Sequence, residues 1–120
     1  MGVTAIDLQV DDVSAATKLL SEAYGWRVLS RPSTGSGTGG FGELDAGGLR
    51  IMLSRDAMVP WGALDGLILH HDVDDVPSAV ERAVSAGAEL LSGPLTTDWG
   101  TEAAYLRGPG ALIVDVCRDV

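Results

Sequence analysis

Few side chains in this 120-residue chain are candidates for acid–base catalysis, ligand binding or thiol chemistry. His70 lies two positions before Asp72, and either Asp72 or Asp115 could orient its imidazole as a general base. The alternative is a hydrogen-bonded structural histidine. Asp7 and Asp115 could act as a carboxylate pair or hold the ammonium group of a ligand. The single cysteine, Cys117, can form neither an internal disulfide nor a cysteine metal cluster, and we expect an inert thiol there.

The charge balance narrows the class of partner. Eight basic and 17 acidic residues give a net charge of −9, the wrong sign for binding nucleic-acid phosphates or anionic lipid headgroups. No apolar stretch approaches the roughly 18–20 residues of a membrane span, and no basic region followed by an apolar one opens the chain. We therefore expect a cytoplasmic protein with a neutral or cationic small-molecule partner and no nucleic-acid or membrane partner.

The elements that must position these side chains occur twice. Val10-Asp11-Asp12-Val13 recurs 63 positions later as Val73-Asp74-Asp75-Val76, and the match continues through the rest of each half. In each copy a strand-like alternation leads into an aspartate cap, an apolar pattern of helical spacing and a closing glycine, then three further strands. The sequence predicts an α+β protein of two tandem βαβββ modules. It forms one domain, 1–120, with modules at 1–57 and 64–120 and a linker at 58–63.

The paired modules resemble the vicinal oxygen chelate superfamily. The resemblance rests on the two Val-Asp-Asp-Val helix entries, the helix ends Tyr24-Gly25-Trp26 and Ala86-Gly87-Ala88, and Gly108-Pro109-Gly110 before the last strand. It implies a curved mixed sheet with helices on its convex side. The superfamily includes glyoxalase I, extradiol dioxygenases, fosfomycin-resistance enzymes and bleomycin-resistance binding proteins. Its enzymes hold a divalent metal with residues from the first and last strands of each module.

The resemblance places those four metal positions at Ala5, Met52, Ile68 and Asp115. Alkyl side chains have no lone pairs and a thioether is a weak ligand for a hard cation, so only Asp115 retains a ligand type. We therefore expect no metal and no other cofactor. A register slip of two residues would instead place His70 at the position of Ile68.

Strand alternation gives the other residues of the predicted cavity. Trp61 in the linker and Trp99 in a loop are candidate rim aromatics for a planar or cationic ligand, or else hinge or dimer contacts. The predicted ligand-binding residues are Asp7, Gln9, Arg50, Met52, Trp61, Ile68, His70, Asp72, Trp99, Ile113 and Asp115.

The sequence as a whole favours a metal-independent binding protein, similar to the bleomycin-resistance branch and dimeric like its members. It would sequester a small organic molecule such as a cationic or planar antibiotic or metabolite. Residues 61–120 carry ten acidic and three basic groups, so the second module supplies most of the negative charge. The alternative is a glyoxalase-like lyase or isomerase, or a dioxygenase-type enzyme, that uses His70 and Asp115. An interaction module within a larger assembly is a third possibility.

Overall fold

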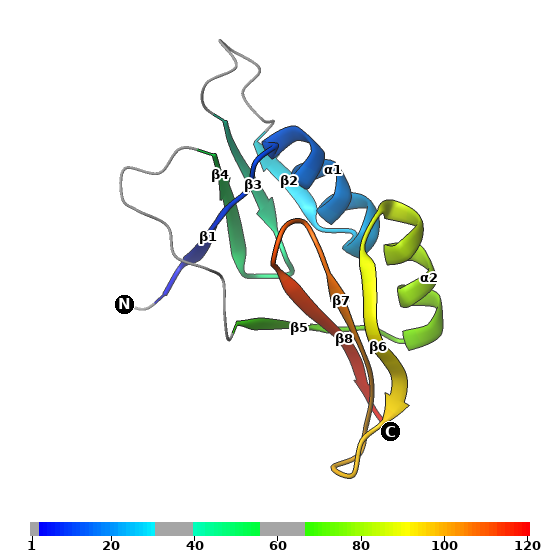
Figure 1. Ribbon diagram of the computed structural model, residues 1–120. Helices are drawn as coiled ribbons and strands as arrows, with labels where there is room; N and C mark the ends of the chain where they lie inside the picture. The colour runs from blue at the N-terminus through cyan, green and yellow to red at the C-terminus, as the bar shows by residue number, and fades with distance from the viewer. Residues whose placement is uncertain (1–2, 31–39, 56–66) are drawn as a thin grey trace. The chain divides into compact units, whose positions relative to one another are not determined.

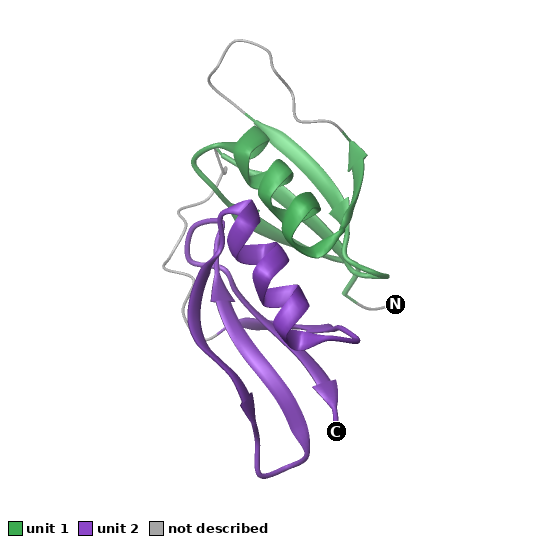
Figure 2. Cartoon of the chain, turned by 90° about the vertical axis from the view of Figure 1, so that its right-hand side faces the viewer, with its two compact units in different colours: residues 1–62 green, residues 63–120 purple. Residues whose placement is uncertain are grey.

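Two compact units, residues 1–62 and 63–120, make up the chain (Figure 2). The computed structural model describes residues 3–30, 40–55 and 67–120. The expected linker at 58–63 and Trp61 within it lie outside the described residues. Neither of the two helices in the described ranges is long and apolar enough to cross a membrane.

Unit 1 is a four-stranded mixed sheet with one helix (Figure 1). The strands run in the order β1-β4-β3-β2, with β1 parallel to β4 and the other pairs antiparallel. Helix α1 lies against β2, β3 and β4. The elements are β1 (Ala5–Gln9), α1 (Val13–Tyr24), β2 (Arg27–Ser30), β3 (Phe41–Asp45) and β4 (Arg50–Ser54).

Unit 2 repeats this topology. Its strand order is β5-β8-β7-β6, with β5 parallel to β8, and α2 lies against β6, β7 and β8. The elements are β5 (Ile68–Asp72), α2 (Val76–Ala86), β6 (Glu89–Thr96), β7 (Thr101–Arg107) and β8 (Ile113–Asp119). The predicted α+β class and the tandem βαβββ modules are thus confirmed.

Equivalent residues begin and end the two helices. The carboxylate of Asp12 accepts a hydrogen bond from the Ala15 amide at 2.9 Å, and that of Asp75 accepts one from the Ser78 amide at 3.1 Å. Each bond satisfies an amide that has no partner within the helix. The helices end at Gly25 (φ 71°) and Gly87 (φ 115°), both in the left-handed region where glycine has no Cβ penalty.

Removing either cap has a defined cost. Asp12→Ala and Asp75→Ala are each expected to lower the free energy of unfolding by about 1 kcal/mol. The matched controls are Asp11→Ala and Asp74→Ala, whose side chains precede the caps, and these should change stability by less than about 0.5 kcal/mol. Urea denaturation followed by circular dichroism measures all four. Equal losses for cap and control would contradict the assignment of the caps.

One face of each sheet is apolar and covered by the helix. In unit 1 the buried residues include Leu8, Leu44, Ile51 and Leu53, which alternate with polar or half-exposed neighbours. In unit 2 they include Ala104, Leu106, Val114 and Val116, and α2 contributes Val76, Val80 and Ala83. The period of two along each strand therefore sends the remaining residues, which include the candidate functional ones, to the opposite face.

Strand β6 is longer than the sequence predicts. The residues at 88–91, followed by a glycine–proline pair, predict a short strand and then a loop, but the structure has one strand, Glu89–Thr96, paired with β7. The register shifts twice, between Leu90 and Ser92 and between Ser92 and Leu95. Such irregularities accommodate a glycine and a proline that would disturb a regular ladder, so Gly93-Pro94 does not end the strand.

Candidate functional site

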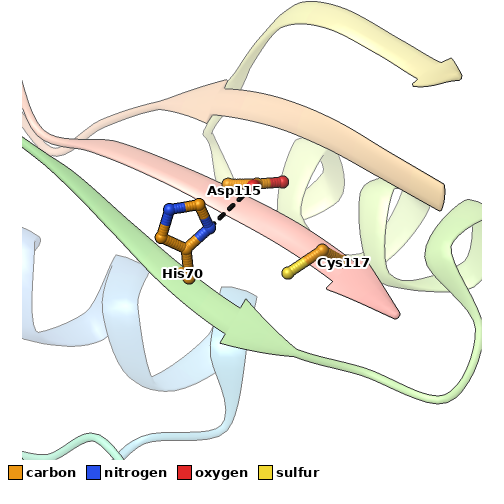
Figure 3. A group of neighbouring side chains, drawn as sticks. All are labelled: His70, Asp115 and Cys117. Atoms are coloured by element: carbon orange, nitrogen blue, oxygen red, sulfur yellow. Dashed lines mark ion pairs between the residues drawn. The ribbon is translucent and has the colours of Figure 1, made fainter. Parts of the chain in front are cut away.

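Four side chains with nitrogen, oxygen and sulfur donors form a two-by-two array on neighbouring strands of unit 2. Strands β5 and β8 are parallel, and their register places His70 beside Asp115 and Asp72 beside Cys117. Because the members on each strand are two residues apart, all four lie on the face opposite α2. We call His70, Asp72, Asp115 and Cys117 the β5–β8 tetrad. Figure 3 shows three of its members converging.

His70 and Asp115 form the closest contact of the tetrad. The imidazole Nδ1 lies 2.8 Å from Oδ2 of Asp115, a hydrogen-bond distance. The two partners differ sharply in exposure, with 68% of the His70 side chain accessible and only 5% of the Asp115 side chain. The imidazole can therefore move away at little cost, whereas the carboxylate is fixed in the sheet.

The second oxygen of Asp115 lacks a partner. Oδ1 is buried and forms no hydrogen bond with any described residue. A buried carboxylate oxygen that has lost its water and gained no donor is costly, and such groups in native proteins commonly belong to functional sites. Burial of the Asp115 carboxylate therefore does not stabilise the fold, which favours a functional role for this residue.

Cys117 completes the array from the end of β8. Its thiol lies 3.9 Å from Oδ1 of Asp72 and 4.0 Å from the carbonyl oxygen of His71. Burial raises the pKa of the Cys117 thiol, and the charges of Asp115 and Asp72 raise it further. This agrees with the expectation of an unreactive thiol, since the thiolate is the nucleophile.

Apolar and aromatic side chains surround the tetrad. Ile68 lies two residues before His70 on the same face and is 41% exposed. Its partner across the ladder, Ile113, is half-buried. Tyr105 of β7 lies directly across from Asp115. Tyr105 is not among the ligand-binding residues predicted from the sequence, although an antiparallel β7–β8 hairpin would have placed it opposite Asp115. The face thus combines a few polar groups with an apolar surround, as small-molecule sites do.

His71, next in the chain, lies on the face toward α2 and is half-buried there. Burial lowers its pKa, with Asp72 opposing and Arg82 reinforcing that shift. Its imidazole is therefore outside the tetrad, as the strand alternation predicts.

The corresponding face of unit 1 holds most of the other predicted ligand-binding residues. The Ser54 hydroxyl donates to Asp7 at 2.8 Å, and Arg50 lies 3.5 Å from Glu43. Met52 pairs with Asp7 across the β1–β4 ladder, and Gln9 pairs with Ser54. Asp7 belongs to unit 1 and Asp115 to unit 2, so their action as a carboxylate pair stays a prediction.

Trp99, the other rim candidate, is 75% exposed at the turn between β6 and β7. The turn is held by Thr97 and Thr101, whose hydroxyls lie 2.8 Å apart, and by the Thr97 amide donating to the Thr101 carbonyl at 2.7 Å. An exposed indole on a well-bonded turn is available for a ligand or a protein partner.

The residues at the superfamily's metal positions do not fit the inherited metal centre. Ala5, Met52 and Ile68 offer no hard donor, and the partner of Ile68 across the ladder is Ile113 rather than Asp115. The donors next to Asp115 are instead His70 and Cys117, whose ligand atoms lie with an Asp115 oxygen within 4.8 Å of one another. Of the four positions that the resemblance implies, only Asp115 has a donor, and the potential donors nearest to it in the described residues belong to unit 2.

Comparison with known proteins agrees with this fold. Residues 4–117 match the family model described as "Glyoxalase-like domain". No curated protein matches the chain significantly. Among solved structures, a protein described as "conserved domain protein" is 28% identical with a TM-score of 0.72, and the match covers 100% of both chains.

Two further structures have more informative names. A glyoxalase/bleomycin resistance protein/dioxygenase family enzyme from Burkholderia phytofirmans PsJN is 19% identical, with a TM-score of 0.78 and 98% of each chain covered. The fosfomycin resistance protein FosX from Listeria monocytogenes is 15% identical, with a TM-score of 0.73, and the match covers 99% of this chain and 91% of that one. With the family match over nearly all residues, the chain belongs to the Glyoxalase-like domain family of the vicinal oxygen chelate superfamily.

Proposed function

We propose that the protein binds and sequesters a small organic molecule that carries a positive charge or a planar ring, without using the superfamily's inherited metal centre. The observation that carries the proposal is Asp115, a buried carboxylate in the sheet. Among the described residues, one of its oxygens has no hydrogen-bond partner and the other is paired with the exposed imidazole of His70. A ligand ammonium would replace His70 at Oδ2 and form a charge-assisted hydrogen bond there.

The surroundings of Asp115 support a cationic guest. Arg107 of β7, on the same face as Tyr105, is paired with Glu89 at 2.6 Å, and Arg118, which alternation sends to the opposite face of β8, is paired with Glu102 at 2.8 Å. Asp72 adds a further carboxylate within the tetrad, and Ile68 and Tyr105 provide apolar contact area. The names of FosX and of the bleomycin-resistance family concern antibiotics, which makes an antibiotic or a related metabolite a reasonable guest class. Within unit 2, Trp99 would contribute a further contact, and ligand binding by Asp7, Gln9, Arg50 and Met52 of unit 1 stays a prediction.

Titration calorimetry tests the proposal. The probes are metal-free bleomycin and daunorubicin, both cationic, with N-acetyl-daunorubicin as the matched control that keeps the planar rings and loses the charge. We expect micromolar binding of at least one cationic probe in the presence of EDTA, and at least tenfold weaker binding of the acetylated control. No binding of either cationic probe at about 100 µM, or binding that EDTA abolishes, would contradict the proposal.

The proposal includes a homodimer, because exposed apolar residues lie on the edge strand of each sheet. Leu29 of β2 and Leu91 of β6 are 41% and 39% exposed, and the duplication places them at equivalent positions. Sedimentation of the calorimetry samples tests this part, and a monomer at the working concentration would refute it.

An enzyme that uses His70 and Asp115 is the second candidate. The distance of 2.8 Å between Nδ1 and Oδ2 suits a carboxylate that orients a general base and leaves Nε2 free for a substrate proton. Mass analysis of the probe after incubation separates the candidates. A probe that stays unchanged supports sequestration. A probe that the wild type converts, but that His70→Gln leaves unchanged, supports the enzyme.

A further inference from the structure

We infer that the β5–β8 tetrad also binds one divalent transition-metal ion, with Zn²⁺ as the best-suited ion, through His70, Asp72, Asp115 and Cys117. This site differs from the inherited centre in three of its four positions and lies wholly within unit 2. It does not rest on the proposed function, which needs no metal. The two proposals are linked only because the ligand ammonium and the metal ion would each bind to Asp115.

The register of the two strands brings the donors together. A parallel β5–β8 ladder pairs His70 with Asp115 and Asp72 with Cys117, so two i, i+2 pairs stand side by side on one face. One donor atom each from His70, Asp115 and Cys117 lies within 4.8 Å of the others, and Asp72 reaches the thiol at 3.9 Å. Zinc bonds of about 2.0–2.3 Å require donors somewhat closer together, which rotation of exposed His70 and Asp72 can supply.

The buried carboxylate supplies an independent argument for a bound cation. Oδ1 of Asp115 has no hydrogen-bond partner among the described residues, and the residue is only 3% exposed. A metal ion at Oδ2 would neutralise the charge that burial makes costly. Exposed carboxylate clusters lack such a feature, because water satisfies their oxygens.

The donor set determines which metal fits. One imidazole, one thiolate and two carboxylates form a four-coordinate set that suits Zn²⁺ and Co²⁺. Mg²⁺ and Ca²⁺ prefer oxygen ligands only, and in larger number. The tetrad should therefore discriminate strongly against hard cations such as Mg²⁺ and Ca²⁺.

The other unit provides an internal control. The duplication places Asp7, Gln9, Met52 and Ser54 of unit 1 at the positions of His70, Asp72, Asp115 and Cys117, with the same ladder pairing. This set has neither imidazole nor thiol, and its methionine takes the place of the buried carboxylate. The same strand geometry with weaker donors is expected to bind no transition metal.

Cobalt titration of EDTA-stripped full-length protein, followed by absorption, tests the inference. We expect one Co²⁺ per chain, a near-ultraviolet band from thiolate-to-cobalt charge transfer, and displacement by Zn²⁺ but not by millimolar Mg²⁺. Cys117→Ser should lose the charge-transfer band, and Asp115→Asn and His70→Gln should each weaken binding at least tenfold. The control Asp11→Asn, which removes an exposed carboxylate outside both proposed sites, should titrate like the wild type.

Several outcomes would overturn the inference. They are the absence of the charge-transfer band at saturating Co²⁺, an unchanged band in Cys117→Ser, or equal weakening by Asp11→Asn and Asp115→Asn. Circular dichroism of each variant shows whether it has folded, and the conservative Cys117→Ser exchange remains informative if Asp115→Asn does not fold. Since the calorimetry of the organic probes is done in EDTA, either proposal can fail without the other.

Discussion

Replacing Asp115 with valine is expected to raise the stability of the protein and to abolish its binding of cations. Valine is close to aspartate in size, suits the interior of a strand, and removes a carboxylate that is buried with an unpartnered oxygen. The only described hydrogen-bond partner that would be lost is His70, whose exposed ring can turn to water. We expect an increase of about 1–2 kcal/mol in the free energy of unfolding, at the lower end of what replacement of buried charges gives.

This prediction separates a functional carboxylate from a structural one. The control is Asp7→Val, which removes an exposed carboxylate bonded to Ser54 and should change stability by less than about 0.5 kcal/mol. Urea denaturation measures stability, and the calorimetric and cobalt titrations measure binding. If Asp115→Val lowered the free energy of unfolding by more than about 1 kcal/mol, Asp115 would be a structural residue and both proposals would lose their main support.

Replacing Gly93 with alanine is expected to cause a large loss of stability. Gly93 has φ of +92°, and a Cβ there would lie 2.6 Å from the Ala103 carbonyl oxygen and 3.0 Å from Cα of Ala104. Both atoms belong to the backbone of β7, so the clash can be relieved only by moving the strand that carries Tyr105. The expected cost is at least about 2–3 kcal/mol.

Gly47→Ala isolates the part of this loss that comes from close contact. Gly47 also has a positive φ, +80°, but no atom lies within 4 Å of the Cβ position, so its cost should stay near 1 kcal/mol, the price of the left-handed conformation alone. Thermal and urea denaturation compare the two variants. Equal losses would show that backbone conformation, rather than the approach of β6 to β7, makes Gly93 necessary.

Local patterns were sufficient to predict the helices and the faces of the strands. The aspartate caps, the closing glycines and the alternation around Leu8 and Val114 depend on neighbours a few residues away, and the structure confirms them. The placement of Trp99 in a loop was confirmed for the same reason. The predicted end of β6 was wrong. A glycine–proline pair is typical of a loop, and only the pairing with β7 shows that register shifts keep this pair within the strand.

The arrangement of the tetrad depended on contacts that sequence patterns do not contain. Alternation placed His70, Asp72, Asp115 and Cys117 on one face, but it left open which residue of β5 lies beside which residue of β8. The superfamily resemblance implied Ile68 and Asp115 as metal positions without pairing them, and the ladder places His70 beside Asp115.

The sequence by itself determined the duplicated fold and the negative charge, since each follows from residue types and local spacing. Only the tertiary structure decided that Asp115 is buried with an oxygen that has no partner among the described residues, and that His70 and Cys117 lie next to it. The physical reason is that burial and ladder register are set by packing between strands 45 residues apart in the chain.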